Sequence, residues 1–255
     1  MQLKFTLLAF LLATFEIVSA TNYCNSSLCP WGTHIACGNN GEFASSCQDP
    51  ALVTLTQANR NAIVNAHNVK RNLVAGGETK LEPACRMATM QWDDELAALA
   101  ELNVKQCQLQ IDDCHNTDAF QFSGQNLALM FPPVSKTIEQ IIQSFVDLWY
   151  SVIKVTTMAD INEYPNDNQG RAIGIFTVMV ADRNIRVGCA AATYTVANQP
   201  NPAVLVACKY ATTNMVGFPT YKSCPTPGSD CKTGKSTTFE NLCSRSEVYD
   251  VNTWW

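Results

Sequence analysis

The sequence predicts an α+β fold in which helices cover both faces of a short antiparallel sheet. Three segments in the first two thirds of the chain carry apolar residues at helical spacing. Segments rich in valine, alanine and threonine follow them, as expected for strands. We therefore expect a three-layer α-β-α sandwich, preceded by a disulfide-stapled N-terminal extension and followed by a loop-rich C-terminal tail.

The first twenty residues have the features of a secretory signal peptide. Lys4 precedes an apolar run that extends to Val18, and the small residues Ser19 and Ala20 mark a cleavage point. We expect residues 1–20 to be removed and the mature protein to be secreted into the extracellular space. No later stretch holds eighteen uninterrupted apolar residues, so we expect no membrane span.

Charge and cysteine content narrow the function classes. Removal of the signal peptide takes away Lys4 and Glu16, one charge of each sign, so the net charge stays at −5. The chain lacks the clustered Lys and Arg residues that nucleic acids and anionic membranes require as partners. Its twelve cysteines contain no Cys-x-x-Cys pair, which favours six disulfides over a metal cluster. We expect no cofactor.

Residues 21–54 form the predicted Cys-rich N-terminal extension. Four of the twelve cysteines lie here among Gly, Asn and Ser residues, with little hydrophobic periodicity. The sequon that begins at Asn25 is a candidate glycosylation site in an exported protein.

Three amphipathic helices are expected in the following domain. The first begins after Thr56 and ends at Gly76, the first residue of a Gly-Gly pair. The second begins after the N-cap Asp93. The third runs from about Thr137 to near Lys154 and carries a single apolar stripe.

The next segments predict neighbouring antiparallel strands at Ala172–Ala181, Arg186–Val196 and Ala203–Tyr210. The last one follows a turn-forming stretch at residues 198–202. Residues 217–255 return to Pro, Gly, Ser and Thr, which indicates a loop-rich C-terminal tail and not a second domain.

Five short motifs stand in order along the chain: His67–Arg71, Trp92–Leu96, Gly124–Ala128, Val187–Cys189 and Cys208–Tyr210. Together they resemble the CAP superfamily (SCP/TAPS), and within it the insect antigen-5-like, cysteine-rich secretory protein-like group. In the last motif Lys209 stands where a neutral polar residue is commoner. The resemblance implies an α-β-α sandwich and places the CAP domain at residues 55–216.

The resemblance also implies four disulfides: Cys24–Cys37, Cys29–Cys114, Cys47–Cys107 and Cys189–Cys208. Of the remaining cysteines, Cys231 and Cys243 would close a short loop in the tail. That leaves Cys85 to pair with Cys224.

Many CAP domains have two His and two acidic residues around a central cavity, a ligand set that suits zinc. In this chain the four matching positions are occupied by Ile111, Gln125, Val152 and Ile175. Three of these side chains have no lone pair to offer a metal. We therefore expect no zinc at the family site, and a drier cavity centre in which aliphatic side chains are buried.

The other reactive side chains give little support for catalysis. His67 is expected to be a hydrogen-bonded packing residue on the first helix, and His34 to have no partner within the extension. A hydrolase would need a pair such as Ser123 or Ser151 with His115. Neither serine lies in a Gly-x-Ser-x-Gly elbow, and six disulfides would leave no thiol nucleophile.

The sequence therefore favours a secreted, non-catalytic effector that binds another extracellular protein. The resemblance implies such roles for insect relatives in saliva, venom and reproductive secretions, and divergence at the metal positions favours a reproductive secretion. The alternative is a carrier of a sterol or fatty acid, suggested by the apolar run Leu127–Pro133, which would otherwise pack under the third helix. A hydrolase is the least supported class.

Overall fold

The computed structural model describes residues 21–254, so the predicted signal peptide lies outside the described residues. One mixed sheet has the strand order β1-β4-β5-β3, and β2 also pairs with β4. The strands are β1 (Ala51–Leu52), β2 (Gln91–Trp92), β3 (Gly124–Met130), β4 (Arg186–Tyr194) and β5 (Ala203–Tyr210). β2 runs parallel to β4, and the other neighbours are antiparallel.

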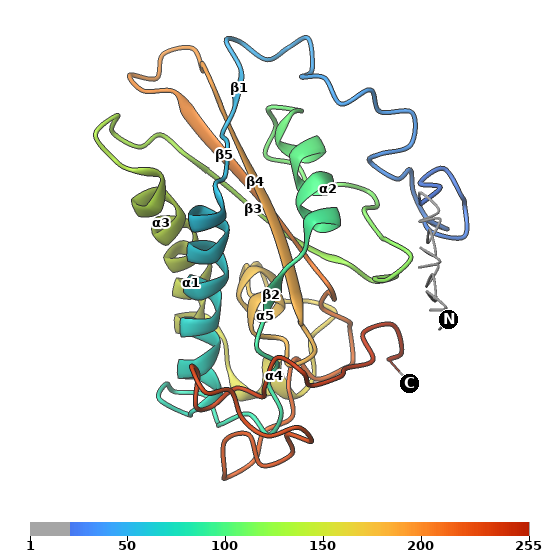
Figure 1. Cartoon of the computed structure of the whole chain (residues 1–255), viewed down its shortest axis with the longest axis vertical. Helices are drawn as coiled ribbons and strands as arrows, with labels where there is room; N and C mark the ends of the chain where they lie inside the picture. Colours follow the sequence, from blue (N-terminus) through green and yellow to red (C-terminus); the bar gives the residue numbers. More distant parts are fainter. Residues whose placement is uncertain (1–20, 255) are drawn as a thin grey trace, which may run out of the picture.

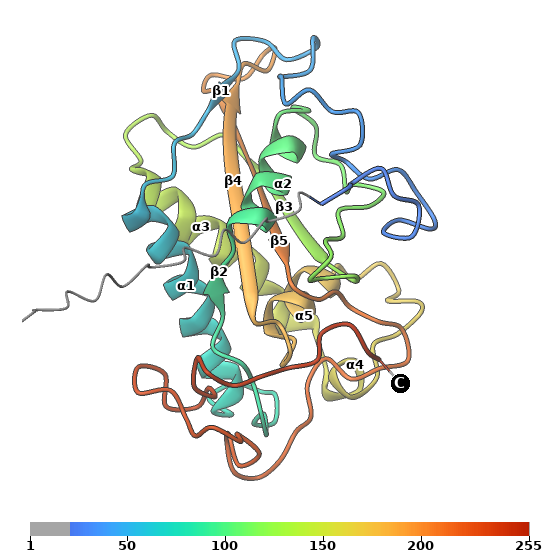
Figure 2. The ribbon, with the colours of Figure 1, turned by 45° about the vertical axis from the view of Figure 1, so that its right-hand side comes forward.

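Helices cover both faces of this sheet. They are α1 (Gln57–Ala75), α2 (Asp94–Val104), α3 (Ile138–Tyr150), the 3-10 helix η1 (Ser151–Val155), α4 (Met158–Asn162) and α5 (Gly174–Val180). Helices α1 and α3 lie side by side on one face, and α2 lies on the other (Figures 1 and 2). The predicted α+β fold is confirmed.

Side-chain caps begin the three long helices. The hydroxyl of Thr56 accepts a hydrogen bond from the Asn59 amide, and the Asp93 carboxylate accepts one from the Leu96 amide. Thr137 begins α3 in the same way. The predicted third helix is therefore real, although its last turn, after Tyr150, is the 3-10 helix η1.

Alternation along the strands builds two separate cores. On β5, Val206 and Cys208 face α1 and α3, whereas Leu205 and Ala207 face α2. Helix α2 packs directly onto β4, because a Cβ atom at Gly188 would lie only 2.1 Å from the backbone nitrogen of Ala97. The same alternation directs Lys209 toward the α2 face.

Two predicted segments differ from the structure. Ala172–Ala181 was expected to be a strand, but Gly174–Val180 forms the helix α5. Its β-branched residues Thr177, Val178 and Val180 are buried, and this packing outweighs their preference for strands. The predicted apolar loop Leu127–Pro133 is also different, because its first four residues complete β3.

Five disulfides cross-link the described chain: Cys24–Cys37, Cys29–Cys114, Cys47–Cys107, Cys189–Cys208 and Cys231–Cys243. The expected sixth, Cys85–Cys224, is not formed, and both residues are free thiols. A backbone bridge between Ala84 and Ser223 brings the two thiols together, but they share a hydrogen bond in place of a covalent one.

The C-terminal tail, residues 217–254, contains no helix or strand and crosses beside α1 and β2 (Figures 1 and 2). Its anchor is the buried carboxylate of Glu247, which accepts hydrogen bonds from Arg86 Nε at 2.7 Å and from the Thr233 amide at 2.7 Å. Burial opposes ionisation of this group, but the hydrogen bonds from Thr233 and Lys232 and the contact with Arg86 lower its pKa to about 2. No helix within residues 21–254 has the length and apolar character needed to cross a bilayer.

Candidate functional site

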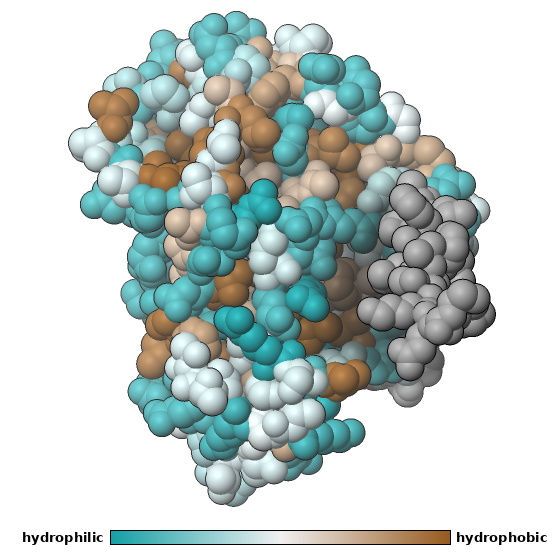
Figure 3. All heavy atoms as spheres, in the orientation of Figure 1, coloured by the Kyte–Doolittle hydropathy of each residue, from teal (hydrophilic) through white to brown (hydrophobic). Residues whose placement is uncertain are grey.

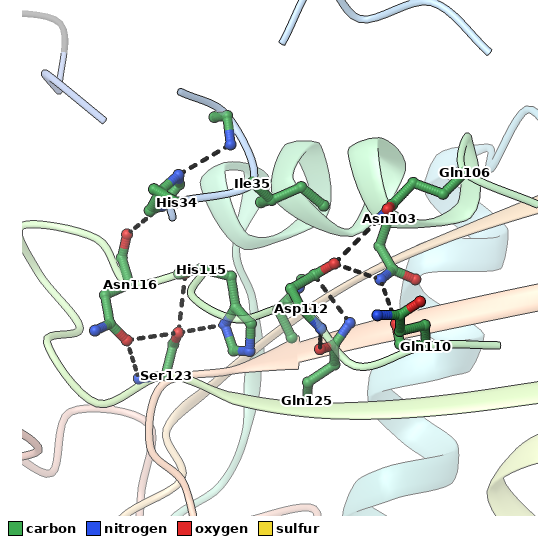
Figure 4. Close-up of polar contacts among 12 residues, drawn as sticks. His34, Ile35, Asn103, Gln106, Gln110, Asp112, His115, Asn116, Ser123 and Gln125 are labelled. Atoms are coloured by element: carbon green, nitrogen blue, oxygen red, sulfur yellow. Dashed lines mark hydrogen bonds and ion pairs between the residues drawn. The ribbon is translucent and has the colours of Figure 1, made fainter. Parts of the chain in front are cut away.

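A buried polar cluster lies beneath α2, where the loop after this helix meets the sheet (Figure 4). Its centre is the carboxylate of Asp112, which forms an ion pair with the ammonium of Lys209. The same carboxylate accepts hydrogen bonds from Asn103 at 2.7 Å, from Gln125 at 3.1 Å and from Gln106 at 3.2 Å. We refer to these five residues as the Asp112 cluster.

The charges of the Asp112 cluster are almost completely removed from solvent. The side chain of Lys209 is 0% exposed and that of Asp112 is 4% exposed. Burial lowers the pKa of Lys209 to about 8, and the neighbouring Asp112 carboxylate opposes this shift. Such a pair contributes structure more than net stability, because desolvation offsets much of the attraction. It fastens the loop after α2 to the sheet.

Asp112 belongs to none of the motifs found in the sequence. The signal in the sequence is Lys209, a cation near the end of the buried strand β5, because a buried ammonium requires an anionic partner. Asp112, the anionic partner of Lys209, directly follows Ile111, which is one of the four positions compared with the family metal site.

A second buried group adjoins this cluster (Figure 4). The Nδ1 atom of His115 lies 2.5 Å from the hydroxyl oxygen of Ser123. That oxygen is also 2.9 Å from the carbonyl oxygen of His115 and 3.2 Å from Oδ1 of Asn116. Burial, with the nearby charge of Lys209, holds the pKa of His115 well below its ordinary value.

The structure thus brings together Ser123 and His115, the pair that a hydrolase would need. Both side chains are buried, and neither lines any of the grooves described below. The single hydroxyl proton has three acceptors within 3.2 Å, all on His115 and Asn116 of its own loop. This geometry suits a structural hydrogen bond.

Ser151, the other serine considered for a hydrolase, donates a hydrogen bond to the Leu148 carbonyl at the end of α3.

His34 was expected to have no partner, and this expectation is wrong. Its Nδ1 accepts from the Ala36 amide at 3.0 Å, so its Nε2 carries the proton and donates to the Asn116 carbonyl at 2.8 Å. The ring also stacks on Tyr23, with 4.6 Å between centroids. His34 therefore joins the N-terminal extension to the chain after Cys114.

His67 behaves as predicted. It lies fully buried on α1, where Nδ1 donates to the Ile63 carbonyl at 2.8 Å and Nε2 accepts from the Tyr210 hydroxyl at 3.0 Å. Burial lowers the pKa of His67 to about 4, and the neighbouring Arg71 acts in the same direction. The neutral imidazole is thus a packing residue between helix and sheet.

The four positions compared with the family metal site do not form one centre. Gln125 belongs to the Asp112 cluster on the α2 face, whereas Val152 and Ile175 pack against the core under α1 and α3. Ile111 is 57% exposed. The expectation of a drier centre is therefore wrong for Ile111, which is not buried, and for Gln125, which lies beside a buried ion pair.

These residues do not fit a zinc ion. Both polar atoms of the Gln125 side chain are bonded to Asp112. Its Nε2 donates to the Asp112 carboxylate, and its Oε1 accepts from the Asp112 backbone amide at 3.0 Å. The ammonium of Lys209 would repel a divalent cation next to it. Across residues 21–254, no three His, Cys, Asp or Glu side chains are grouped in a way that could hold a metal.

A groove of about 400 Å³ lies between the N-terminal extension and the loop after α2, and Gln106 and Asp112 of the Asp112 cluster are among its lining residues. His34, Ile35 and Asn39 line one side, and Gln110 and Ile111 line the other. We refer to it as the extension groove. Figure 4 shows Ile35 and Gln110 beside the buried cluster.

A different cavity lies between α1, α3 and the sheet. Its lining is apolar except for His67, and includes Ile63, Ile142, Phe145 and Trp149. The space inside is only about 20 Å³. We refer to it as the α1/α3 crevice.

Comparison with known proteins gives a consistent assignment. Residues 64–210 match the model of the cysteine-rich secretory protein family, CAP. The chain is 37% identical to Venom allergen-1 of Aedes albopictus, over 89% of this chain and 88% of the relative. It is 30% identical to Tabinhibitin 6 of Tabanus yao, over 96% of each.

The fold is also that of a solved structure, NaASP2 with Zn2+, at a TM-score of 0.62 and 21% identity, covering 78% of this chain and 100% of the other. The venom allergen relatives and the five disulfides indicate an extracellular protein. This chain belongs to the cysteine-rich secretory protein (CAP) family.

Proposed function

We propose that this protein is an extracellular, non-catalytic effector that binds another protein at the extension groove. The observation that carries the proposal is a group of exposed apolar side chains in the two segments that form this groove. Ile111, which lines the groove, is 57% exposed. Leu109 and Trp31, which stand one and two positions from lining residues, are 57% and 91% exposed. Exposed tryptophan next to a groove is typical of a protein-binding surface, where such residues supply much of the affinity.

The two segments that carry these side chains lie against each other. A Cβ atom at Gly32 would be 3.0 Å from the Cβ of Asp113, which places Trp31 next to the loop that contains Ile111. The face shown in Figure 3 is mainly hydrophilic, with its apolar residues in separate groups. Trp31, Leu109 and Ile111 thus bring three exposed apolar side chains to the two segments that form the groove.

The walls of the extension groove are held rigidly. The disulfide Cys29–Cys114 joins the extension to the loop after α2, and the Asp112 cluster fixes that loop to the sheet. A surface that is ordered before binding loses less conformational entropy when the complex forms. The buried polar residues thus support the binding surface from within, which is a use for them that requires no catalysis.

Affinity capture from the native fluid tests this function. The mature protein is used as bait beside the double variant Trp31→Ala/Ile111→Asp. The control is Val134→Asp, which changes a side chain that is 86% exposed and does not line the groove. A partner retained by the wild type and the control, and lost by the double variant, supports the proposal. Equal recovery with all three baits contradicts it.

We also propose a reproductive secretion as the fluid in which this effector acts. The support is the replacement of all four family metal positions, which indicates a specialised role. Quantitative proteomics of dissected glands tests this setting. Enrichment in reproductive tissue is the expected result, and enrichment confined to salivary or venom tissue would reject it.

Carriage of a sterol or fatty acid is the second candidate, and the α1/α3 crevice is the observation that favours it. Ligand pockets usually occupy about 300–1,000 Å³, so a lipid would have to separate α1 from α3. The run Leu127–Pro133 no longer adds support, because Leu127 and Leu129 pack in the core under α2. Lipid extracts of the purified protein that contain no stoichiometric lipid would eliminate this candidate.

A further inference from the structure

We propose that a second groove, on the opposite side of β2 from α2, binds an acidic polysaccharide segment. This groove has a volume of about 490 Å³. It is lined by Asn61, Val64, Asn65, Asn68, Gln91, Trp92, Arg186, Thr238, Phe239 and Arg245. We refer to it as the arginine groove. It shares no lining residue with the extension groove, so the two proposals fail or succeed independently.

The charge of the arginine groove is opposite to that of the whole protein. The chain carries a net charge of −5, yet the lining contains two arginines and no Asp or Glu. Among residues 21–254, the guanidinium groups of Arg186 and Arg245 form no ion pair and no hydrogen bond; the other described arginines each form at least one. Two unpaired guanidinium groups at one groove create a local attraction for carboxylate or sulfate groups.

Four segments far apart in the sequence build this groove and hold it in shape. α1 and β2 provide two sides, β4 contributes Arg186, and the C-terminal tail crosses beside α1 and β2 (Figure 2). Gln91 donates to the backbone carbonyl of Arg245 at 3.2 Å, and the amide of Asn241 donates to the Asn72 side chain at 2.9 Å. The disulfide Cys231–Cys243 closes the tail just before Arg245. The site is therefore formed before ligand arrives.

The neutral residues beside the arginines suit a sugar better than a peptide. Asn65 is exposed, and its side-chain amide has no hydrogen-bond partner within residues 21–254, so it is free to bind hydroxyl groups. The indole of Trp92 is fixed by a hydrogen bond from Nε1 to Asp94 at 3.0 Å and offers an amphipathic surface for a pyranose ring. The apolar members Val64 and Phe239 are partly or fully buried, which leaves no deep pocket for an apolar peptide side chain.

The test measures binding of the mature protein to a fluorescent heparin hexasaccharide by fluorescence polarisation. The key variant is Arg186→Gln/Arg245→Gln. The matched control is Lys136→Gln/Lys154→Gln, which removes the same charge from two exposed residues outside the groove. Circular dichroism confirms that each variant is folded. Asn65→Ala tests the hydroxyl contact without changing charge.

The proposal predicts saturable binding that weakens at least tenfold in the arginine variant and less than twofold in the lysine control. Binding should weaken several-fold in Asn65→Ala and as salt increases. Competition by desulfated heparin or by hyaluronan distinguishes sulfate from carboxylate as the recognised group. No binding by the wild type, equal losses in both double variants, or stronger competition by polyglutamate than by any glycan would overturn it.

Discussion

The ammonium of Lys209 on β5 pairs with the carboxylate of Asp112 in a space that excludes water on the α2 face of the sheet. This internal cation–anion pair is surrounded by three side-chain amides, and the group includes Gln125 and the neighbour of Ile111, two of the four positions compared with the family metal site. The loop that carries Asp112 also carries the exposed residues Leu109 and Ile111. The buried pair thus connects the core to the proposed binding surface.

Removing the cation of this pair should destabilise the protein strongly. In Lys209→Met the carboxylate of Asp112 stays buried with only amide donors, and breaking a buried pair costs about 3–5 kcal/mol. Urea denaturation followed by tryptophan fluorescence measures the loss. The matched control is Lys222→Met, which breaks the exposed pair with Asp230 and should leave the midpoint almost unchanged.

A second variant separates loss of the charge pair from loss of packing. In Lys209→Met/Asp112→Asn no charge is buried, so most of the stability should return. If the double variant is no more stable than Lys209→Met, the ion pair is not the reason for the loss.

Acid should destabilise the protein through its buried histidines. The pKa of folded His67 is about 4, below its ordinary value of 6.5. Between these values the unfolded chain binds a proton that the folded protein does not, so stability falls as the pH falls from 6.5 to 4. This lowering of the pKa corresponds to a loss of about 3 kcal/mol in the free energy of unfolding once the pH has fallen to 4. The pKa values of His34 and His115 are also lowered, which acts in the same direction.

The measurement is the free energy of unfolding at several pH values between 4 and 7, for the wild type and for His67→Gln. Glutamine does not titrate, so the slope should be shallower in the variant while its stability at pH 7 is lower. Identical slopes would mean that folding does not lower the pKa of His67.

Zinc should have no effect on the folded protein. A ligand that binds only the folded state raises its stability in proportion to the logarithm of its concentration. Because Ile111, Val152 and Ile175 offer no donor and Gln125 is occupied by Asp112, the unfolding midpoint should not move as zinc is added. Tight stoichiometric binding in a calorimetric titration, abolished by Gln125→Ala, would contradict this expectation.

The tail should loosen when its anchor is neutralised. In Glu247→Gln the bonds from Arg86 and Thr233 lose their charge assistance, while other tail contacts such as Asn241 to Asn72 remain. Limited proteolysis should cleave the tail several times faster than in the wild type. The control Glu240→Gln alters an exposed tail carboxylate and should be cleaved at the wild-type rate.

Local patterns predicted much of the fold. The caps Thr56, Asp93 and Thr137 mark where α1, α2 and α3 begin, and strands β4 and β5 follow from their alternation. The segment Gly174–Val180 was misassigned because its residues favour strands in isolation, whereas burial among other elements makes it helical. Short-range patterns do not contain this packing information.

The candidate site was less predictable, for a related reason. Asp112 and Lys209 are 97 residues apart, and so are invisible to any local pattern. The resemblance directed attention to Ile111 and Gln125, and the second of these does belong to the Asp112 cluster. The partner of His34 and the free thiols of Cys85 and Cys224 depend on how distant backbone segments meet, which spacing alone does not determine.

Native mass spectrometry of the secreted protein in its own fluid is the most direct test of the central claim. We predict a complex between the protein and a second polypeptide, with no metal adduct, and we expect this complex to be absent for Trp31→Ala/Ile111→Asp. A protein found without any polypeptide partner but with stoichiometric zinc or lipid would contradict this prediction.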